Sequence, residues 1–216
     1  MATQQVLGNI LAIGAHPDDI EIGCGGTLIK LNAMGYKIYQ ILMTEGTEEI
    51  GFQGRSEEQC LASELMGIQS VFRPKLMDTR IELKDAIRTI EPVLERIQPE
   101  YVFTHFYQDT HQDHKVVHDA TVSACRNRGN ILFYETLSTE MFFPTIHVDI
   151  HETIDQKVKC IRAHLSQESR LNIVNFVKNM ASLRSHRTDM QHVEGFTPRK
   201  LKIFAAEAEM HAIPSH

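Results

Sequence analysis

The chain has 216 residues, which is enough for one domain that buries a core without disulfides. Apolar residues make up 42% of it and charged residues 23%, as in ordinary globular proteins. A formal net charge of −6, with no run of Lys or Arg, argues against nucleic-acid or anionic-membrane binding.

Three further observations narrow the class of protein. No apolar run approaches the roughly 20 residues that a membrane span needs. The first five residues lack the charged and apolar parts of a secretory signal. The four cysteines lie far apart with no Cys-x-x-Cys pair, a pattern typical of idle thiols in a reducing compartment. We expect one cytoplasmic domain over residues 1–216, without a membrane span or a nucleic-acid partner, that forms a homo-oligomer.

Apolar runs and amphipathic stretches predict an alternation of strands and helices. In chain order we expect a strand at Val6–Ile13, a helix at Thr27–Met34, a strand at Lys37–Met43, a helix at Arg55–Met66 and a short strand at Val71–Phe72. There follow a helix at Leu83–Ile97, a strand at Tyr101–Phe103, a helix at Lys115–Cys125, strands at Ile131–Tyr134 and Ile146–Ile150, and helices at Thr153–Leu165, Arg170–Leu183 and Pro198–Met210. The strand at Ile146–Ile150 is expected at an edge, and Pro92 weakens the third helix.

This alternation predicts an α/β fold with a mainly parallel sheet covered by helices on both faces. Ligands of such sheets bind beyond the carboxyl ends of the strands. Two polar clusters follow strands directly, at His16–Asp19 and within His105–His114. We therefore expect both clusters at the same edge of the sheet.

The residue types in the two clusters are those that bind a metal ion. In hydrolytic sites zinc takes three His or carboxylate ligands and keeps one position for water. His16, Asp19 and one histidine of the pair His111 and His114 make such a set. Asp18 would then accept a proton from the activated water. The other histidine, oriented by Asp113, could stabilise an oxyanion or protonate the leaving group.

Other interpretations of these residues remain open at this point. An Asp-Asp pair after a strand is often a turn or a helix cap. His114 and His118 are four residues apart and could bind one ion, although the glutamate of a His-Glu-x-x-His motif is missing. His105 could be a ligand, although we expect it at a solvated strand end. Gly23, Gly25 and Gly26 do not fit a dinucleotide-binding motif, and we expect them to allow close packing beneath the metal loop.

Together these residues resemble the PIG-L/LmbE-like family of zinc-dependent N-deacetylases. The resemblance rests on Ala15-His16-Pro17-Asp18-Asp19, Glu21-x-Gly23-x-Gly25-Gly26 and His111-x-Asp113-His114, with further matches at Gly54-Arg55-x-x-Glu58, His164-x-Ser166-Gln167 and Ala206-Glu207-Ala208. It implies a Rossmann-like sheet and removal of an N-acetyl group from a sugar amine, such as an N-acetylglucosamine-type sugar.

The resemblance also implies roles for individual residues. The metal ligands would be His16, Asp19 and His114, holding Zn²⁺ or alternatively Fe²⁺. Asp18 would be the general base, and His111, paired with Asp113, the oxyanion-stabilising or acidic partner.

Substrate contacts are less closely matched by the family pattern. The pattern assigns Arg55 to substrate hydroxyl or phosphate groups. The stretch Asp78-Thr79-Arg80 departs from the family pattern. Within it, Arg80 is a candidate anchor for an anionic group. Residues 45–54 are a candidate lid.

Two other functions fit parts of the pattern. One is an amidase that cleaves a larger sugar or thiol conjugate. The other is a metal-dependent phosphoesterase, which would need two ions and more carboxylates near the clusters than the sequence offers.

Overall fold

The computed structural model describes residues 6–46, 55–186 and 188–202. Its strands are β1 (Asn9–Gly14), β2 (Lys37–Leu42), β3 (Ser70–Phe72), β4 (Tyr101–His105), β5 (Ile131–Tyr134), β6 (Ile146–Asp149) and β7 (Val193–Lys200). Its helices are α1 (Asp19–Ala33), α2 (Arg55–Met66), α3 (Leu83–Ile97), α4 (Gln112–Ala124), α5 (Ile154–Ala163), α6 (Leu165–Leu171) and α7 (Ile173–Ser185).

The strands form one sheet in the order β3-β2-β1-β4-β5-β7-β6. Strands β1 to β5 run parallel, while β7 is antiparallel to both β5 and β6. The predicted α/β fold with a mainly parallel sheet is confirmed, and so is the edge position of β6.

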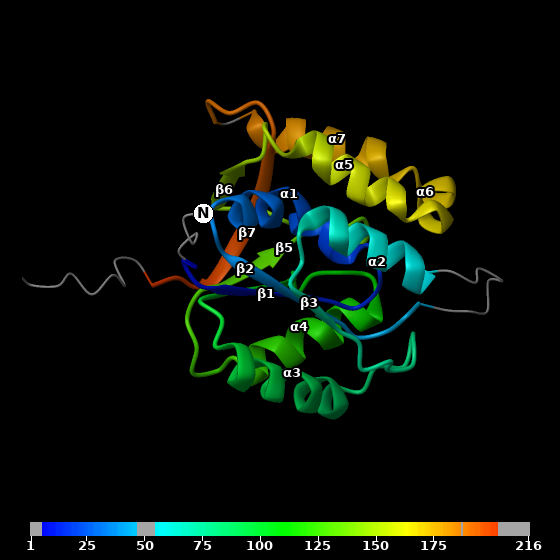
Figure 1. Cartoon of the computed structure of the whole chain (residues 1–216), viewed down its shortest axis with the longest axis vertical. Helices are drawn as coiled ribbons and strands as arrows, with labels where there is room; N and C mark the ends of the chain where they lie inside the picture. Colours follow the sequence, from blue (N-terminus) through cyan, green and yellow to red (C-terminus); the bar gives the residue numbers. More distant parts are fainter. Residues whose placement is uncertain (1–5, 47–54, 187, 203–216) are drawn as a thin grey trace, which may run out of the picture.

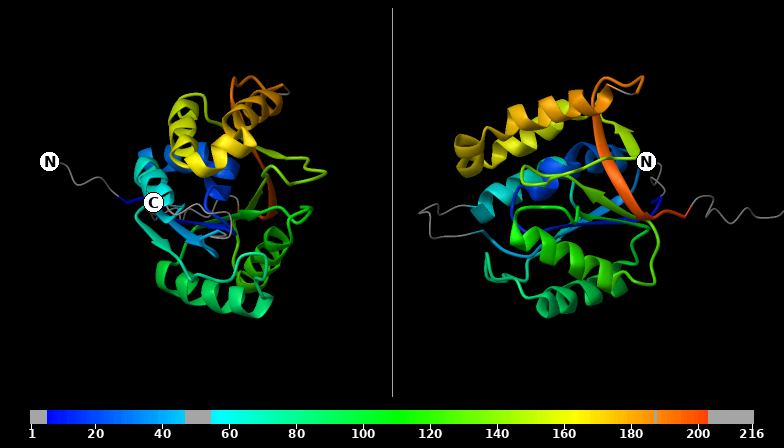
Figure 2. Two further views of the ribbon diagram at one scale, coloured as in Figure 1. Left: turned by 90° about the vertical axis from the view of Figure 1, so that its right-hand side faces the viewer. Right: turned by 180° about the vertical axis from the view of Figure 1, so that it is seen from behind.

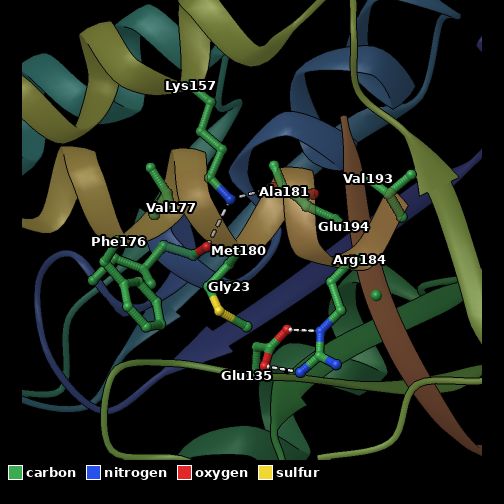
Figure 3. Close-up of a pocket in the computed structure, with 12 residues that line it drawn as sticks. Gly23, Glu135, Lys157, Phe176, Val177, Met180, Ala181, Arg184, Val193 and Glu194 are labelled. Atoms are coloured by element: carbon green, nitrogen blue, oxygen red, sulfur yellow. Dashed lines mark hydrogen bonds and ion pairs between the residues drawn. The ribbon is translucent and has the colours of Figure 1, made fainter. Parts of the chain in front are cut away.

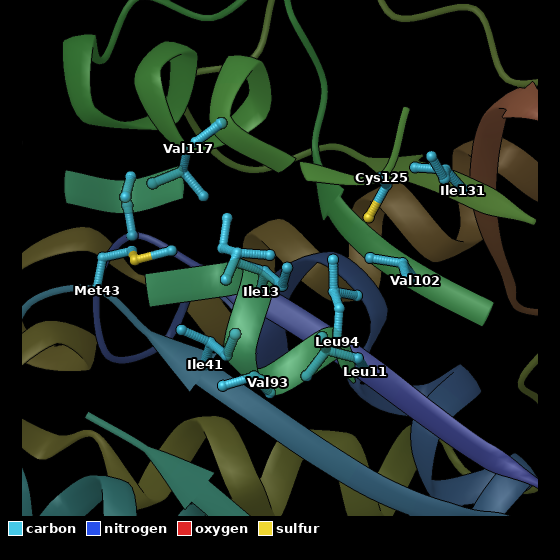
Figure 4. Close-up of a cluster of buried hydrophobic side chains, with 14 of the residues drawn as sticks. Leu11, Ile13, Ile41, Met43, Val93, Leu94, Val102, Val117, Cys125 and Ile131 are labelled. Carbon is cyan, nitrogen blue, oxygen red and sulfur yellow. The ribbon is translucent and has the colours of Figure 1, made fainter. Parts of the chain in front are cut away.

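Alternating side chains of the central strands supply two separate cores. Leu11 and Ile13 of β1 pack with residues of α3 and α4, as Figure 4 shows around Val93 and Val117. Ile10 and Ala12 point the other way and pack against α1. Helices α3 and α4 therefore cover one face, and the remaining helices lie on the other (Figures 1 and 2). This two-sided burial explains why residues 10–13 of β1 are all apolar instead of alternating with polar residues.

Helix α1 begins eight residues earlier than predicted, because its glycines lie inside the helix. A Cβ at Gly23 would lie 2.1 Å from the ring of Tyr134, and one at Gly26 would lie 3.0 Å from Ile150. The hydroxyl of Tyr134 donates to the backbone oxygen of Ile13 over 2.8 Å, which holds the ring in place. The expected close packing at these glycines is thus confirmed, and it brings the start of α1 onto the sheet.

The predicted helix at Pro198–Met210 is wrong where the structure describes it. Residues 198–200 belong to β7, and residues 203–210 lie outside the described residues. Val193 and Phe196 are buried, and the pairing register of β7 with β5 shifts between Ile131 and Leu132, opposite Pro198. Such an irregularity accommodates a proline inside a sheet, because no ladder hydrogen bond is required there.

Strand β7 is anchored to α1 and α5 by a buried ion pair. The ammonium group of Lys157 donates to a carboxylate oxygen of Glu194 over 2.6 Å and to the backbone oxygen of Ile22 over 2.7 Å (Figure 3). The same carboxylate accepts from the backbone N–H groups of Gly26 and Thr27. These hydrogen bonds offset the free-energy cost of burying both charges.

The remaining helices differ from expectation only in detail. Helix α3 continues through Pro92, whose exposed position lets water reach the carbonyl that loses its partner. Helices α6 and α7 are separated at Asn172, which has a left-handed backbone. Within the described ranges, no helix combines the length and the hydropathy that crossing a bilayer requires.

The glycines of α1 give a stability test with its own control. We predict that Gly23→Ala lowers the free energy of unfolding by about 2 kcal/mol, because the new methyl group overlaps the fixed ring of Tyr134. At Gly25 the nearest atom to an added Cβ is 3.6 Å away, so Gly25→Ala should leave stability unchanged or raise it by up to about 1 kcal/mol. Urea unfolding followed by circular dichroism measures both, and equal effects would contradict the packing argument.

Candidate metal centre

The two polar clusters lie together at the carboxyl ends of β1 and β4, which are neighbours in the sheet. His16 follows β1, while His111 and His114 follow β4 at the start of α4. The ring of His16 lies 4.6 Å from the ring of His111 and 5.4 Å from that of His114, measured between centroids. The predicted convergence at one edge is confirmed.

A strained turn separates the two aspartates of the first cluster. Asp18 has φ 97°, a left-handed conformation that residues other than glycine rarely adopt. Asp18 occupies the N-cap position of α1, but its side chain makes no capping hydrogen bond to the helix. The carboxylate of Asp19 instead folds back and accepts from the backbone N–H of His16 over 2.7 Å. The turn therefore gives the two adjacent carboxylates different surroundings.

His114 lies between two carboxylates. Its Nε2 is 3.3 Å from Asp19, and its Nδ1 is 3.1 Å from Asp109. Burial by itself lowers the pKa of His114, but the two carboxylates outweigh it and raise the pKa to about 9. This position is therefore built to hold positive charge.

His16 repeats the same arrangement. Its Nδ1 is 3.4 Å from Asp19, and its Nε2 is 3.2 Å from Asp113 and 3.0 Å from Asp78. Both histidines thus direct one nitrogen toward Asp19 and the other toward an outer carboxylate. Histidines that bind metals show this pattern, because the outer carboxylate fixes the ring and its tautomer. The chemistry of these donors, imidazole nitrogens and carboxylate oxygens, suits a divalent cation.

Several donor groups lie close enough to share an ion with these residues. Ligand atoms lie within 4.8 Å of one another in three sets: His16 with His111 and His114, Asp19 with His105 and His114, and His16 with Asp78 and Asp113. All three sets include at least one of the three predicted ligands. The described residues therefore concentrate metal-binding groups at this edge of the sheet.

His105 is not at a solvated strand end, and that expectation is wrong. The residue is fully buried, its Nε2 accepts from the backbone N–H of Ala15 over 3.1 Å, and its ring stacks on His114 at 4.0 Å. Burial and the nearby His114 lower the pKa of His105 to about 4. A neutral His105 thus supports the turn after β1 and the ring of His114.

His118 does not share an ion with His114 in this arrangement. Its Nδ1 bonds to the backbone oxygen of His105 over 2.8 Å, and its ring packs on Phe133. The interpretation that pairs His114 with His118 is therefore not favoured.

His111 caps the N-terminus of α4, where its Nδ1 accepts from the backbone N–H of Asp113 over 3.2 Å. The carboxylate of Asp113 bonds elsewhere, to His16 and to the backbone N–H of Thr79. The expected pairing of His111 with Asp113 thus runs through the backbone and not through the carboxylate. Burial and the nearby His16 lower the pKa of His111. Because Nδ1 accepts a hydrogen bond, the neutral ring carries its proton on Nε2.

Asp18 lies in the same cleft and is buried. Burial, followed by the charge of Asp19, raises the pKa of Asp18 to about 7. A carboxyl group with such a pKa can take up and release a proton near neutral pH.

The two predicted substrate-binding arginines lie in different positions. Arg55 opens α2, lines the cleft, and donates to the backbone oxygen of Pro17 over 3.2 Å. Arg80 is exposed and is not among the residues that line the cleft. Of the candidate lid, residues 47–54 lie outside the described residues.

Two functional carboxylates were missed. The carboxylate of Asp109 contacts Nδ1 of His114 and accepts from the backbone N–H of His111. It also accepts from the hydroxyl groups of Thr136 and Thr139. It could have been found, since a histidine ligand usually has a carboxylate behind it and Asp109 lies in the same loop. Asp78 comes from the segment between β3 and α3, and no local pattern indicates its contact with His16.

The cleft above these residues has a volume of about 390 Å³. Its walls come from both clusters and from four further segments. The lining residues are His16, Asp18, Asp19, Ile22, Arg55, Asp78, Thr79, His111, His114, Thr136, Leu137, Ser138, Gln167 and Leu171.

Two known proteins similar to this chain are named as deacetylases, one found by sequence and one by structure. "Uncharacterized deacetylase YaiS" of Escherichia coli (strain K12) is 36% identical over 167 residues, which cover 73% of this chain and 90% of that protein. The structure of N,N'-diacetylchitobiose deacetylase from Pyrococcus horikoshii has a TM-score of 0.75 at 24% identity, covering 88% of this chain and 82% of that one.

A third protein shows that the fold is shared beyond deacetylases. The structure of GalB, the 4-carboxy-2-hydroxymuconate hydratase from Pseudomonas putida KT2440, has a TM-score of 0.78 at 19% identity, covering 94% of this chain and all of that one. Likeness at this level of identity establishes the fold and not the reaction.

The family itself follows from sequence. The sequence model of the GlcNAc-PI de-N-acetylase (PIG-L) family matches residues 11–125, which include both polar clusters and all three predicted ligands. With that match and the relative at 36% identity, the chain belongs to the GlcNAc-PI de-N-acetylase (PIG-L) family.

Proposed function

We propose that the protein is a metal-dependent hydrolase that removes the N-acetyl group from an N-acetylglucosamine-type sugar or glycoconjugate. The observation that carries the proposal is the arrangement of His16 and His114. Each directs one nitrogen toward Asp19 and the other toward an outer carboxylate. The family and the deacetylase relatives support the same reaction class.

His16, Asp19 and His114 would hold the ion, which we infer to be Zn²⁺, with Fe²⁺ as the alternative. When bound, a divalent cation supplies Lewis-acid polarisation of the amide carbonyl and lowers the pKa of water. Asp78, Asp109 and Asp113 would keep the two imidazole rings oriented from behind.

Proton transfer falls to residues that are not ligands. Asp18 would take a proton from the water whose oxygen bonds to the acetyl carbon. Its pKa of about 7 suits this step, because it favours both uptake and release near neutral pH. The same proton can then pass to the sugar nitrogen as the C–N bond breaks, so that the products are acetate and a free amine.

His111 would stabilise the negative charge that develops on the acetyl oxygen. Because Nδ1 of the ring accepts from the backbone of Asp113, the Nε2–H is the donor available for substrate. A donor fixed by the cap of α4 costs no reorganisation when that charge appears. Asp113 would act indirectly, by holding His16 and α4.

Arg55 would bind an oxygen of the sugar, since it lines the cleft next to the turn that carries Asp18. Arg80 would meet only a substrate that extends beyond the cleft. Its role as an anionic-group anchor stays a prediction, as does the homo-oligomer.

Acetate release tests the proposal directly. We expect the purified chain to bind about one divalent ion and to release acetate from N-acetylglucosamine or its conjugates. A chelator should remove the activity, and added Zn²⁺ or Fe²⁺ should restore it. Free N-acetyl sugars, larger amide conjugates and phosphate esters should be compared in parallel. Activity only on larger amides would favour the amidase, and activity only on phosphate esters would refute the deacetylase.

The proton acceptor can be tested separately from metal binding. We predict that Asp18→Asn lowers kcat by about 10²- to 10⁴-fold while the bound metal stays near one ion per chain. Asp119→Asn is the matched control, because Asp119 is exposed on α4 and does not line the cleft. Unchanged kcat in Asp18→Asn, or loss of the metal with it, would contradict the assigned role.

The outer carboxylates predict a graded effect on metal affinity. Asp109→Asn should raise the metal dissociation constant by about 10- to 100-fold, because Asp109 is the carboxylate bonded to Nδ1 of His114. Asp78→Asn should have a smaller effect, because Asp113 still bonds the same nitrogen of His16. Competition with a chelating dye measures both constants. A larger effect at Asp78 would show that the two histidines are held differently from the arrangement described.

A further inference from the structure

A buried ion pair meets the backbone of α1 in the middle of the helix. In a regular α-helix the N–H of Gly26 bonds to the backbone oxygen of Ile22, four residues earlier. Here the N–H of Gly26 donates to the carboxylate of Glu194 over 2.9 Å, and the oxygen of Ile22 accepts from the ammonium group of Lys157 over 2.7 Å. That ammonium group lies 2.6 Å from the same carboxylate (Figure 3). The ion pair thus bonds both backbone groups that one helical hydrogen bond would join.

The following N–H group, that of Thr27, also donates to Glu194, over 2.7 Å. Two consecutive N–H groups bonded to one carboxylate resemble the capped start of a helix. Side chains that insert into the hydrogen bonds of a helix allow the two parts on either side to take different directions. We call residues 19–25, which precede this point, the front segment of α1.

The front segment begins at the two aspartates of the candidate metal centre. Asp19 is its first residue, and Asp18 precedes it with a left-handed backbone. The N–H of Ile22 donates to the backbone oxygen of Asp18 over 2.9 Å, while the C=O of Ile22 accepts from Lys157. Two hydrogen bonds through the backbone of Ile22 therefore connect the buried ion pair to the residue with the strained conformation.

The ion pair takes its own position from elements outside the metal centre. Lys157 lies on α5 and Glu194 on β7, and both side chains are only 4% exposed. The later part of α1 is held by other contacts, since Leu28 packs in the core and Lys30 donates to the backbone oxygen of Asp149 over 2.7 Å. A non-glycine residue with a left-handed backbone persists where its surroundings hold it. The ion pair supplies such a hold one turn after Asp18.

We propose that Lys157 and Glu194 are positioning residues for the hydrolysis. Their bonds to the backbone of α1 set the place of the front segment, and with it the place of the Asp18 and Asp19 carboxylates relative to the histidines that follow β4. This inference rests on the proposed function and adds two residues that do not line the cleft. Without the pair, the backbone groups it bonds would bond to each other as in a regular helix, and the front segment would shift.

Replacing both charges together separates positioning from stability. Exchange of a buried ion pair for apolar side chains of similar size is often neutral, because the cost of removing two charges from water offsets their attraction. We therefore expect the double variant Lys157→Met/Glu194→Met to fold with a Tm within about 5 °C of wild type. The single variant Lys157→Met is unsuitable, since it leaves the carboxylate of Glu194 buried without a partner.

The kinetic readout is the release of free amine by the metal-loaded protein from the N-acetyl sugar that wild type hydrolyses fastest. We expect kcat of the double variant to fall about 10²-fold, because a displacement of about 1 Å between reacting groups costs that much. KM should change by less than about threefold, since His111 and Arg55, which would contact the substrate, lie on other elements.

Metal affinity is a second readout that does not depend on the reaction. Because Asp19 moves with the front segment, the metal dissociation constant of the double variant should rise about tenfold. Competition with a chelating dye measures it, and circular dichroism shows that the variant is folded.

A second buried ion pair provides the matched control. Arg184 of α7 and Glu135, which follows β5, also lie 2.6 Å apart, and their bonds join α7 to the segment after β5. Arg184→Met/Glu135→Met should leave kcat and the metal dissociation constant within about twofold of wild type.

Three outcomes would overturn the inference and leave the deacetylase intact. They are unchanged kcat and metal affinity in a folded Lys157→Met/Glu194→Met variant, equal losses in the control variant, and failure of the Lys157→Met/Glu194→Met variant to fold, which would make the pair a requirement for folding alone. A change in one readout only would support the inference for the aspartate that it reports, Asp18 for kcat or Asp19 for the metal. If wild type releases amine from no N-acetyl sugar, the proposed function fails, while the metal dissociation constant still decides whether the pair positions Asp19.

Discussion

The carboxylate of Asp19 is the contact on which the rest of the site depends. It accepts from the backbone of His16, and its oxygens lie within 3.4 Å of ring nitrogens of His16, His105 and His114. These residues come from two segments about 90 positions apart, which follow neighbouring strands of the sheet. One buried anion thus joins both halves of the centre. The surrounding imidazoles keep the pKa of Asp19 well below its usual value despite its burial, which by itself raises that pKa.

Asp18 and Asp19 show how adjacent identical residues acquire different chemistry. The left-handed backbone at Asp18 turns the two side chains apart, and the carboxylate of Asp19 is surrounded by histidines. Asp18 is buried beside that charge, and its pKa rises to about 7. Pairs of acidic groups with separated pKa values are a common sign of acid–base catalysis. Close packing of Gly23 on Tyr134, whose hydroxyl holds the end of β1, keeps the backbone on either side of this turn in position.

How far the structure could be predicted depended on whether local patterns determined each feature. The strands and most helices followed from burial, which imposes periodic apolar positions on the sequence. The meeting of the two clusters followed from the parallel order of their strands. The contact of His16 with Asp78 joins residues 62 positions apart through an irregular segment, which no periodicity records. The family resemblance paired Asp113 with His111, but α4 points the carboxylate of Asp113 at His16. At Pro198, a register shift allowed a strand where proline alone suggested the start of a helix.

The sheet by itself does not determine the reaction, since a hydratase and a deacetylase share it with this chain. What differs between enzymes on such a fold is the set of residues at the carboxyl ends of the strands. In this chain those ends supply donors suited to a cation, a buried carboxyl group with a pKa raised to about 7, and a histidine that caps α4 and lines the cleft. Hydrolysis of an amide needs all three, because its carbonyl must be polarised, its water deprotonated and its oxyanion stabilised. The proposed hydrolysis therefore depends on the residues that follow β1 and β4 and not on the sheet that carries them, so we expect substitutions at Asp18 or at the three predicted ligands to change the reaction while the fold stays the same.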